Sequence, residues 1–114
     1  MVRSEIGRAG PLLASSDKLK FTVTGRGGHA SMPHDTLDPI LVACEIVMAI
    51  QAMVARRVSV FDPAVVSISK IASGTTDNIV PETAEMLGTI RTHSPVRRAF
   101  IAEELRRMVP ALAA

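Results

Sequence analysis

The sequence has no tryptophan, no tyrosine and only three phenylalanines among its 114 residues. Proteins that bind single-stranded nucleic acid stack the bases on aromatic side chains, which this chain does not supply. The net charge is only +2, so the pI of about 9.2 reflects a small excess of arginine rather than a polycation. Both shortages argue against nucleic-acid binding, including binding by an RNA-binding module.

Cysteine is nearly absent as well, because Cys44 is the only one. A single cysteine forms no internal disulfide, and it lacks the partners of a zinc motif. Since it lies in an apolar helical stretch, we expect a small side chain of the core. The three histidines, His29, His34 and His93, belong to no Asp, Glu and His cluster with two-metal spacing. We therefore expect no metal ligands in this chain.

Long apolar runs are also missing. No run reaches the roughly 18 uninterrupted residues of a membrane span, and the N-terminal MVRSEIGRAG has no signal-peptide core. A chain of 114 residues buries one hydrophobic core, so we expect a single domain. The sequence predicts a soluble, cytoplasmic protein with no membrane partner.

The clearest secondary-structure pattern is the alternation in KLKFTVT, residues 18–24. It places Leu19, Phe21 and Val23 on one face and lysines and threonines on the other, which is the period of a half-buried strand. Further along, Asp38 followed by Pro39 is a typical helix start, with an acidic N-cap and proline in the first turn. The sequence therefore predicts a strand, a glycine-rich loop and then a helix.

That helix, residues 38–55, is apolar on more than one face. One stripe contains Ile40, Cys44, Val47, Ile50 and Val54. Leu41, Met48 and Met53 lie off this stripe, and few polar residues separate them. A sheet covers only one face of a helix, so the second apolar face needs another burial surface. We expect that surface to be a partner subunit.

Two more strands and a helix complete the pattern, at residues 64–74, at residues 83–92 and from Ser94–Pro95 onward. The order strand, helix, strand, strand, helix indicates an α+β, ferredoxin-like sandwich without its final strand. Its antiparallel sheet would carry two helices on one face and expose strand 18–24 as an edge. The chain therefore looks cut from a larger protein, although its tail or a neighbouring molecule would also cover that edge.

Several separated motifs in this order resemble a known family. They are FTVTGRGGHASMPHDTLDPI, GTTDNIVPE and GTIRT. Together they resemble the lid, or dimerisation, domain of the aminoacylase, carboxypeptidase G and hippurate hydrolase family of metal-dependent amidohydrolases. The N-acyl-amino-acid and indole-acetyl-amino-acid hydrolase branch is the most similar. GPLLAS, residues 10–15, resembles the return hinge, so residues 1–16 would be the linker from a catalytic domain and residues 17–114 the lid.

The resemblance implies a parent enzyme that hydrolyses the amide bond of N-acyl amino acids. Two divalent metal ions, zinc or manganese, would sit in its separate catalytic domain, so this chain alone would be inactive and would hold no cofactor. His29 matches the lid histidine that stabilises the oxyanion in the other subunit's active site. Asn78 and Arg91 match positions that bind the substrate's carboxylate, and Gly28 belongs to the same contact region. The partners implied are a second copy, through residues 38–55 and a sheet edge, and the small substrate.

Each of these residues also has a plainer interpretation. Asn78 suits a turn, since asparagine hydrogen-bonds its own backbone there. Arg91 suits the solvated face of a strand, and His29 suits an ordinary loop. His34, between proline and Asp35, suits local hydrogen bonding. The whole chain would then be a free-standing ferredoxin-like module that binds a small metabolite or a protein without catalysis.

Overall fold

Four antiparallel strands form the main sheet of this computed structural model, which describes residues 2–8 and 15–113. Their order across the sheet is β1, β2, β6, β4. The strands are β1 (Val2–Arg8), β2 (Ser15–Thr24), β4 (Ala64–Ser73) and β6 (Thr83–Thr92). The three predicted strands are confirmed, and β1 is an addition to them.

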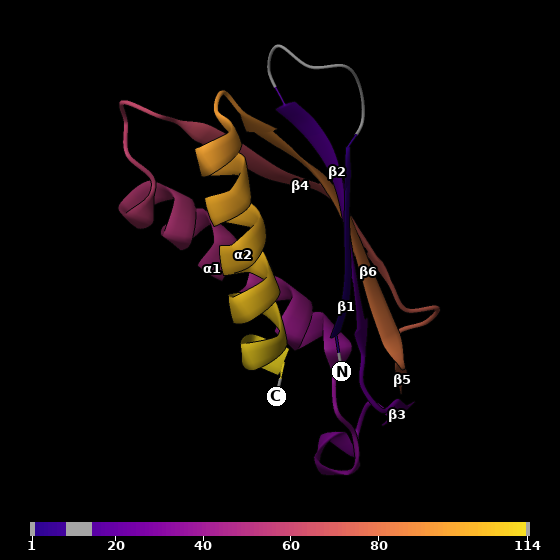
Figure 1. Cartoon of the computed structure of the whole chain (residues 1–114). Coiled ribbons are helices and arrows are strands. Elements are labelled where there is room, and N and C mark those ends of the chain that lie inside the picture. The colour runs from indigo at the N-terminus through magenta and orange to yellow at the C-terminus, as the bar shows by residue number, and fades with distance from the viewer. Residues whose placement is uncertain (1, 9–14, 114) are drawn as a thin grey trace.

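Two helices cover one face of this sheet and leave the other face open (Figure 1). Helix α1 (Pro39–Arg57) packs over β4 and β6, and helix α2 (Pro95–Ala113) packs over β1, β2 and β6. The result is a two-layer α+β domain, as the sequence predicted. The free long edge of β4 lies on the same side of the domain as α1.

The core lies between the sheet and the helices. Leu19, Phe21 and Val23 of β2 are all buried, as their alternation predicts. On the neighbouring strand β6, Met86, which pairs with Phe21, and Ile90 are also buried. The lysines and threonines of β2 therefore face the open side of the sheet, which no helix covers.

The expected open edge of β2 does not exist in the structure. Strand β1 pairs with β2 over its whole length, from Val2 opposite Val23 to Arg8 opposite Asp17. It takes the place beside β2 that the missing final strand would have filled. The expectation of an unprotected edge was wrong, because part of the predicted linker 1–16 is itself a strand. Residues 10–14 of the predicted hinge lie outside the described residues.

Strand β4 is an edge strand with an irregularity in its middle. The pairing with β6 shifts register between Ile68 and Lys70. This bulge explains the imperfect alternation of the sequence, since an extra residue reverses the faces that follow it. From Ser69 to Ser73 every residue is exposed. The described chain therefore leaves the second half of β4 uncovered.

Helix α1 begins as predicted, because the carboxylate of Asp38 accepts a hydrogen bond from the backbone N–H of Ile40 (Oδ1···N 2.9 Å). Its buried stripe differs from the predicted one, however. It consists of Pro39, Ala43, Ile46, Ile50 and Met53. Cys44 is exposed, so its assignment to the core was wrong, and Met53 is buried. A helix with apolar residues nearly all round gives periodicity little basis for choosing the inward face.

The outward side of α1 remains apolar. Leu41 is 65% exposed and Met48 is 72% exposed. By length and composition alone α1 is able to cross a membrane, with a mean hydropathy of 1.7, and only 28% of that window is buried. Its inward stripe nevertheless packs on the sheet, as in the core helix of a folded domain. The predicted second apolar face of this helix is thus present, as exposed side chains.

Helix α2 starts at the predicted Ser94–Pro95. The hydroxyl of Ser94 accepts a hydrogen bond from the backbone N–H of Arg97 (N···Oγ 3.0 Å), which caps the helix. The helix continues past Pro110, so the tail that the sequence left unexplained forms its last turn. Val96 is 77% exposed rather than part of the core.

Candidate functional site

The loop between β2 and α1 is tightly built. It contains the short strand β3 (Gly28–His29) and a 3-10 turn (Pro33–Asp35). Arg26 and Leu37 exchange two backbone hydrogen bonds, each with N···O 2.9 Å, which close the base of the loop. The loop is therefore a fixed projection at one end of the sheet (Figure 1).

This loop is attached to the segment before β6. Strand β3 pairs with the two-residue strand β5 (Ile79–Val80), with His29 opposite Ile79. The backbone N–H of Ala30 donates to the carbonyl of Asn78 (N···O 2.9 Å). The structure thus brings together two predicted site residues, His29 and Asn78, that are far apart in the sequence. Both are exposed.

The glycines of the loop let its backbone pack closely against neighbouring segments of the same chain. Among the described residues only Gly74 has a positive φ, of 88°, so Gly27 and Gly28 need no left-handed backbone. A Cβ on Gly27 would come within 2.5 Å of the carbonyl oxygen of Val80, and one on Gly28 within 2.9 Å of Thr36 Cγ2. Larger residues would therefore push the loop away from β5 and from the turn that follows.

The imidazole of His29 is held by the residue two positions later. The backbone N–H of Ser31 donates to Nδ1 at 3.1 Å, and Ser31 Oγ lies 2.6 Å from the same nitrogen. Ser31 is not among the site residues predicted from the sequence. The sequence feature that could have indicated this contact is a serine two residues after the histidine, because serine hydroxyls often hydrogen-bond to groups that close in the chain. The predicted local contact of His34 is weak, with Nε2 3.7 Å from Asp35 Oδ1.

Arg91 lies at the other end of the domain. It lies on β6, where it pairs with Ser16 of β2 on one side and with Val65 of β4 on the other. It is one residue before the end of the strand. From Thr83, where β6 begins beside the loop, Arg91 is about 26 Å away at the usual rise of a strand. Its side chain is exposed on the open face of the sheet. Within one chain, Arg91 is therefore not brought together with His29 and Asn78.

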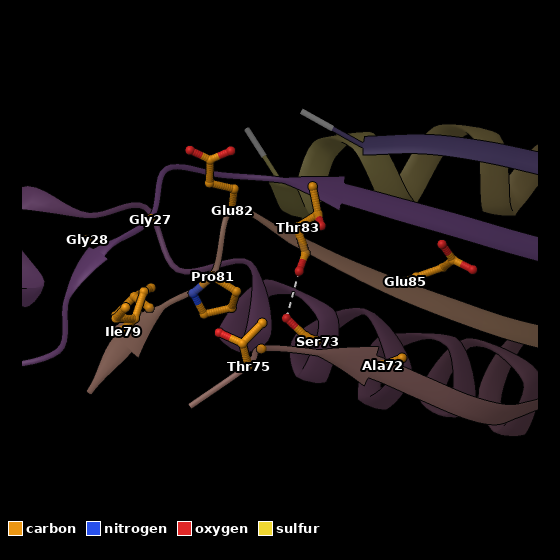
Figure 2. A pocket seen from close by; sticks show the side chains of 12 residues that line it. Gly27, Gly28, Ala72, Ser73, Thr75, Ile79, Pro81, Glu82, Thr83 and Glu85 are labelled. Atoms are coloured by element: carbon orange, nitrogen blue, oxygen red, sulfur yellow. Dashed lines mark hydrogen bonds between the residues drawn. The ribbon is translucent and has the colours of Figure 1, made fainter. Parts of the chain in front are cut away.

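A shallow pocket of about 560 Å³ lies beside the loop, between the end of β4 and the start of β6. Figure 2 shows Ser73 and Thr83 across its floor, joined by a hydrogen bond (Oγ···O 2.6 Å). Of the predicted site residues, only Gly28 lines it. Glu82 and Glu85 also line it, so a substrate carboxylate would meet two carboxylates there. The pocket does not suit the anionic end of an N-acyl amino acid.

The described part of the chain offers no fit for a two-metal centre. Residues 2–8 and 15–113 contain no group of three His, Cys, Asp or Glu side chains able to hold one metal ion. Zinc and similar ions need at least three protein ligands in a catalytic site. These residues therefore do not build such a centre, and no chemical step through a metal is assigned to them.

Comparison with known proteins gives the family. The sequence family described as peptidase dimerisation domain matches residues 14–114. The chain is 40% identical over 107 residues to an N-acetylcysteine deacetylase of Bacillus subtilis. The aligned region covers 94% of this chain and 28% of that protein. It is 44% identical over 105 residues to thermostable carboxypeptidase 2 of Saccharolobus solfataricus, covering 92% of this chain and 27% of that protein. The chain therefore spans little more than a quarter of these relatives.

Solved structures agree with the sequence comparison. A dinuclear metal-binding peptidase of the M20 family from Bacillus subtilis is 33% identical, with a TM-score of 0.65, over 95% of this chain and 25% of that one. An aminobenzoyl-glutamate utilization protein from Klebsiella pneumoniae shares the fold, with a TM-score of 0.78 at 20% identity, over 95% of this chain and 29% of that one. The chain thus belongs to the peptidase dimerisation domain family, the dimerisation module of the metal-dependent M20 hydrolases that act on amide bonds.

Proposed function

We propose that this chain is the dimerisation and active-site lid domain of an enzyme that hydrolyses the amide bond of N-acyl amino acids. The observation that carries the proposal is the loop that joins His29 to Asn78 through β3, β5 and the Ala30–Asn78 hydrogen bond. Relatives named N-acetylcysteine deacetylase and N-acetyldiaminopimelate deacetylase, each 40% identical, support an acylated amino acid as the substrate class.

His29 is suited to stabilise the transition state of this reaction. Water attack on an amide places negative charge on the former carbonyl oxygen, and a fixed N–H donor aimed at that oxygen lowers the barrier. The imidazole is exposed on a rigid projection, where a substrate held by another domain has access to it. Removing one such donor costs about 2.7–4 kcal/mol of barrier in comparable sites.

The dimer surface we propose consists of the outward side of α1 and the free edge of β4. Both lie on the same side of the domain (Figure 1), and Leu41 and Met48 leave apolar surface exposed there. Unpaired backbone groups of an edge strand are a ready template for pairing with another chain. A second copy related by a two-fold axis would pair with β4 and cover α1 at once.

This two-fold arrangement also resolves the separation of Arg91 from His29. Two sheets joined antiparallel along β4 place opposite ends of the two domains side by side. The His29 and Asn78 end of one protomer would then lie at the same end of the joined sheet as Arg91 of the partner subunit. One substrate would be contacted by His29 from one copy and by Arg91, with its bidentate guanidinium, from the other.

A complementation experiment tests this assignment in the full-length enzyme that contains the domain. His29→Ala should lower kcat by about 10²–10³-fold without loss of bound metal. Arg91→Ala should weaken substrate binding, because a carboxylate loses its paired donor. When the two variants are mixed and allowed to exchange subunits, each mixed dimer has one site with both residues intact. At a substrate concentration too low for the Arg91→Ala variant to turn over, we expect recovery of about a quarter of the wild-type rate.

The control is His34→Ala, an exposed histidine of the same loop, which should keep normal turnover. Normal turnover in His29→Ala would overturn the oxyanion role. Inactive single variants that give no recovery on mixing would mean that both residues come from the same subunit, against the arrangement proposed.

A further inference from the structure

The hydrogen bonds around His29 determine which ring nitrogen carries the proton. A neutral imidazole has one N–H donor and one lone-pair acceptor, and its surroundings select the tautomer. The backbone N–H of Ser31, 3.1 Å from Nδ1, is able only to donate. Nδ1 therefore presents its lone pair, and the proton of the neutral ring lies on Nε2.

The hydroxyl of Ser31 acts on the same nitrogen. Its oxygen lies 2.6 Å from Nδ1, closer than the backbone nitrogen, and a hydroxyl hydrogen rotates to suit its partner. Both donors come from one residue, so they fix the rotation of the ring as well as its tautomer. Among the described residues, none donates to or accepts from Nε2.

The backbone that carries Ser31 is itself held in place. The N–H of Met32 donates to the carbonyl of His29 (N···O 2.9 Å), which closes a tight turn around Ser31. The N–H of Ala30 donates to Asn78 (N···O 2.9 Å), which ties this turn to the segment before β6. The position of the Ser31 donors is thus set by the fold rather than by the substrate.

We propose that Ser31 is a positioning residue that keeps His29 in the Nε2–H tautomer and aims that N–H outward. The inference rests on the proposed function, in which His29 donates to the oxyanion. The opposite tautomer would present a lone pair to a developing negative charge and would repel it. Ser31 therefore keeps the ring ready as a donor before the substrate arrives, without touching the substrate.

The tautomer is measurable on the 114-residue chain by ¹⁵N NMR, because the two ring nitrogens give different shifts and couplings in each form. The measurement uses a pH about two units above the ordinary histidine value of about 6.5, where imidazoles are neutral. We expect a single Nε2–H pattern for His29. The exposed side chains of His34 and His93 report the averaged pattern in the same spectrum. An averaged or Nδ1–H pattern for His29 in the unmodified chain would overturn the proposal.

Two substitutions separate the hydroxyl from the fold of the loop. Ser31→Ala keeps the backbone donor and loses only the hydroxyl, so it should move His29 part of the way toward the averaged pattern, while Ser31→Thr, which keeps a hydroxyl, should restore the single pattern. An unchanged pattern in the alanine variant, or no restoration by threonine, would reject the role of the hydroxyl. In the full-length enzyme, Ser31→Ala should lower kcat by about tenfold, a loss of about 1.4 kcal/mol, with KM unchanged. Should His29→Ala prove harmless, the proposed function fails while the tautomer result stands on its own.

Discussion

The two helices have equal length and cover the same face of one sheet, yet their outward surfaces differ. Both α1 and α2 have 19 residues. On α2, charged side chains find partners within the chain, such as Arg98 with Asp17 and Arg107 with Glu104. On α1, the outward side is mostly apolar and exposed. The chain therefore supplies partners for charged side chains of α2 itself, whereas the apolar outward side of α1 stays uncovered, as the dimer proposed above requires.

The largest expected effect comes from breaking the contact that holds α2. Asp17 is only 1% exposed, and Arg98 donates to it twice, with Nε···Oδ2 and Nη2···Oδ1 both 2.9 Å. This hydrogen-bonded carboxylate raises the pKa of Arg98. Asp17→Asn leaves the cation without its charge partner. We expect the free energy of unfolding to fall by about 3 kcal/mol, the lower end for a broken buried pair, because Arg98 is one-third exposed.

Urea denaturation of the chain measures this loss. The matched control replaces both partners, Asp17→Leu with Arg98→Met, and should unfold at nearly the wild-type midpoint, since an apolar pair of similar size leaves no unpaired charge. A loss under about 1 kcal/mol in Asp17→Asn would mean that α2 is held by its apolar contacts alone.

The second effect tests the incomplete side of the comparison. Met48 is 72% exposed on α1, and an arginine there would have to be buried in the proposed dimer. We expect Met48→Arg to weaken dimerisation by about 30-fold, a loss of about 2 kcal/mol, as for a central interface residue. Sedimentation at several concentrations gives the dissociation constant.

The control for Met48 is Val96→Arg on α2, which alters a similarly exposed apolar residue, 77% exposed, on the completed helix. It should leave the dimer unchanged. Equal dimerisation of Met48→Arg and the unmodified chain would show that the outward side of α1 is not the interface.

The sequence predicted what depends on local pattern. The strand containing Leu19 and Phe21 follows from alternation, and the start of α1 follows from Asp38 and Pro39. The inward face of α1 could not be predicted from the sequence. Cys44, which is exposed, and Met53, which is buried, are both apolar, and the helix has few polar residues to mark its outer side. The strand Val2–Arg8 was not predicted, because Val2 and Ile6 are its only large apolar residues and give little alternation to read.

The candidate site shows the same division. His29 and Asn78 were predicted as site residues from their motifs, but their proximity depends on the pairing of β3 with β5, which no local pattern encodes. The contact of Ser31 with His29 was not predicted, because it depends on the turn that brings Oγ to the ring. Arg91 was also predicted as a site residue from its motif, but its distance from the loop becomes known only from the register of β6.

The smallest effect concerns the junction where the two helices meet. Glu104 of α2 forms ion pairs with Arg107 of its own helix (Nη2···Oε2 2.6 Å) and with Arg57 of α1 (Nη1···Oε1 2.8 Å). The hydrogen bond from Arg107, with the charges of both arginines, lowers the pKa of Glu104 against the opposing effect of burial. The arginines are 62% and 51% exposed, so solvent screens the contact and its effect on stability is modest.

The sign of the pH dependence follows from this lowered pKa. The folded chain holds Glu104 ionised to lower pH than the unfolded chain, where a glutamate has a pKa of about 4.3. Its contribution is fully present above that value and is lost as the pH falls through the folded value. Glu104→Gln should therefore show a shallower acid loss of stability than the unmodified chain, measured by urea midpoints from neutral pH downward. Glu103→Gln, at the exposed neighbouring position, should keep the full acid slope, and an equally steep slope in Glu104→Gln would place the acid sensitivity elsewhere.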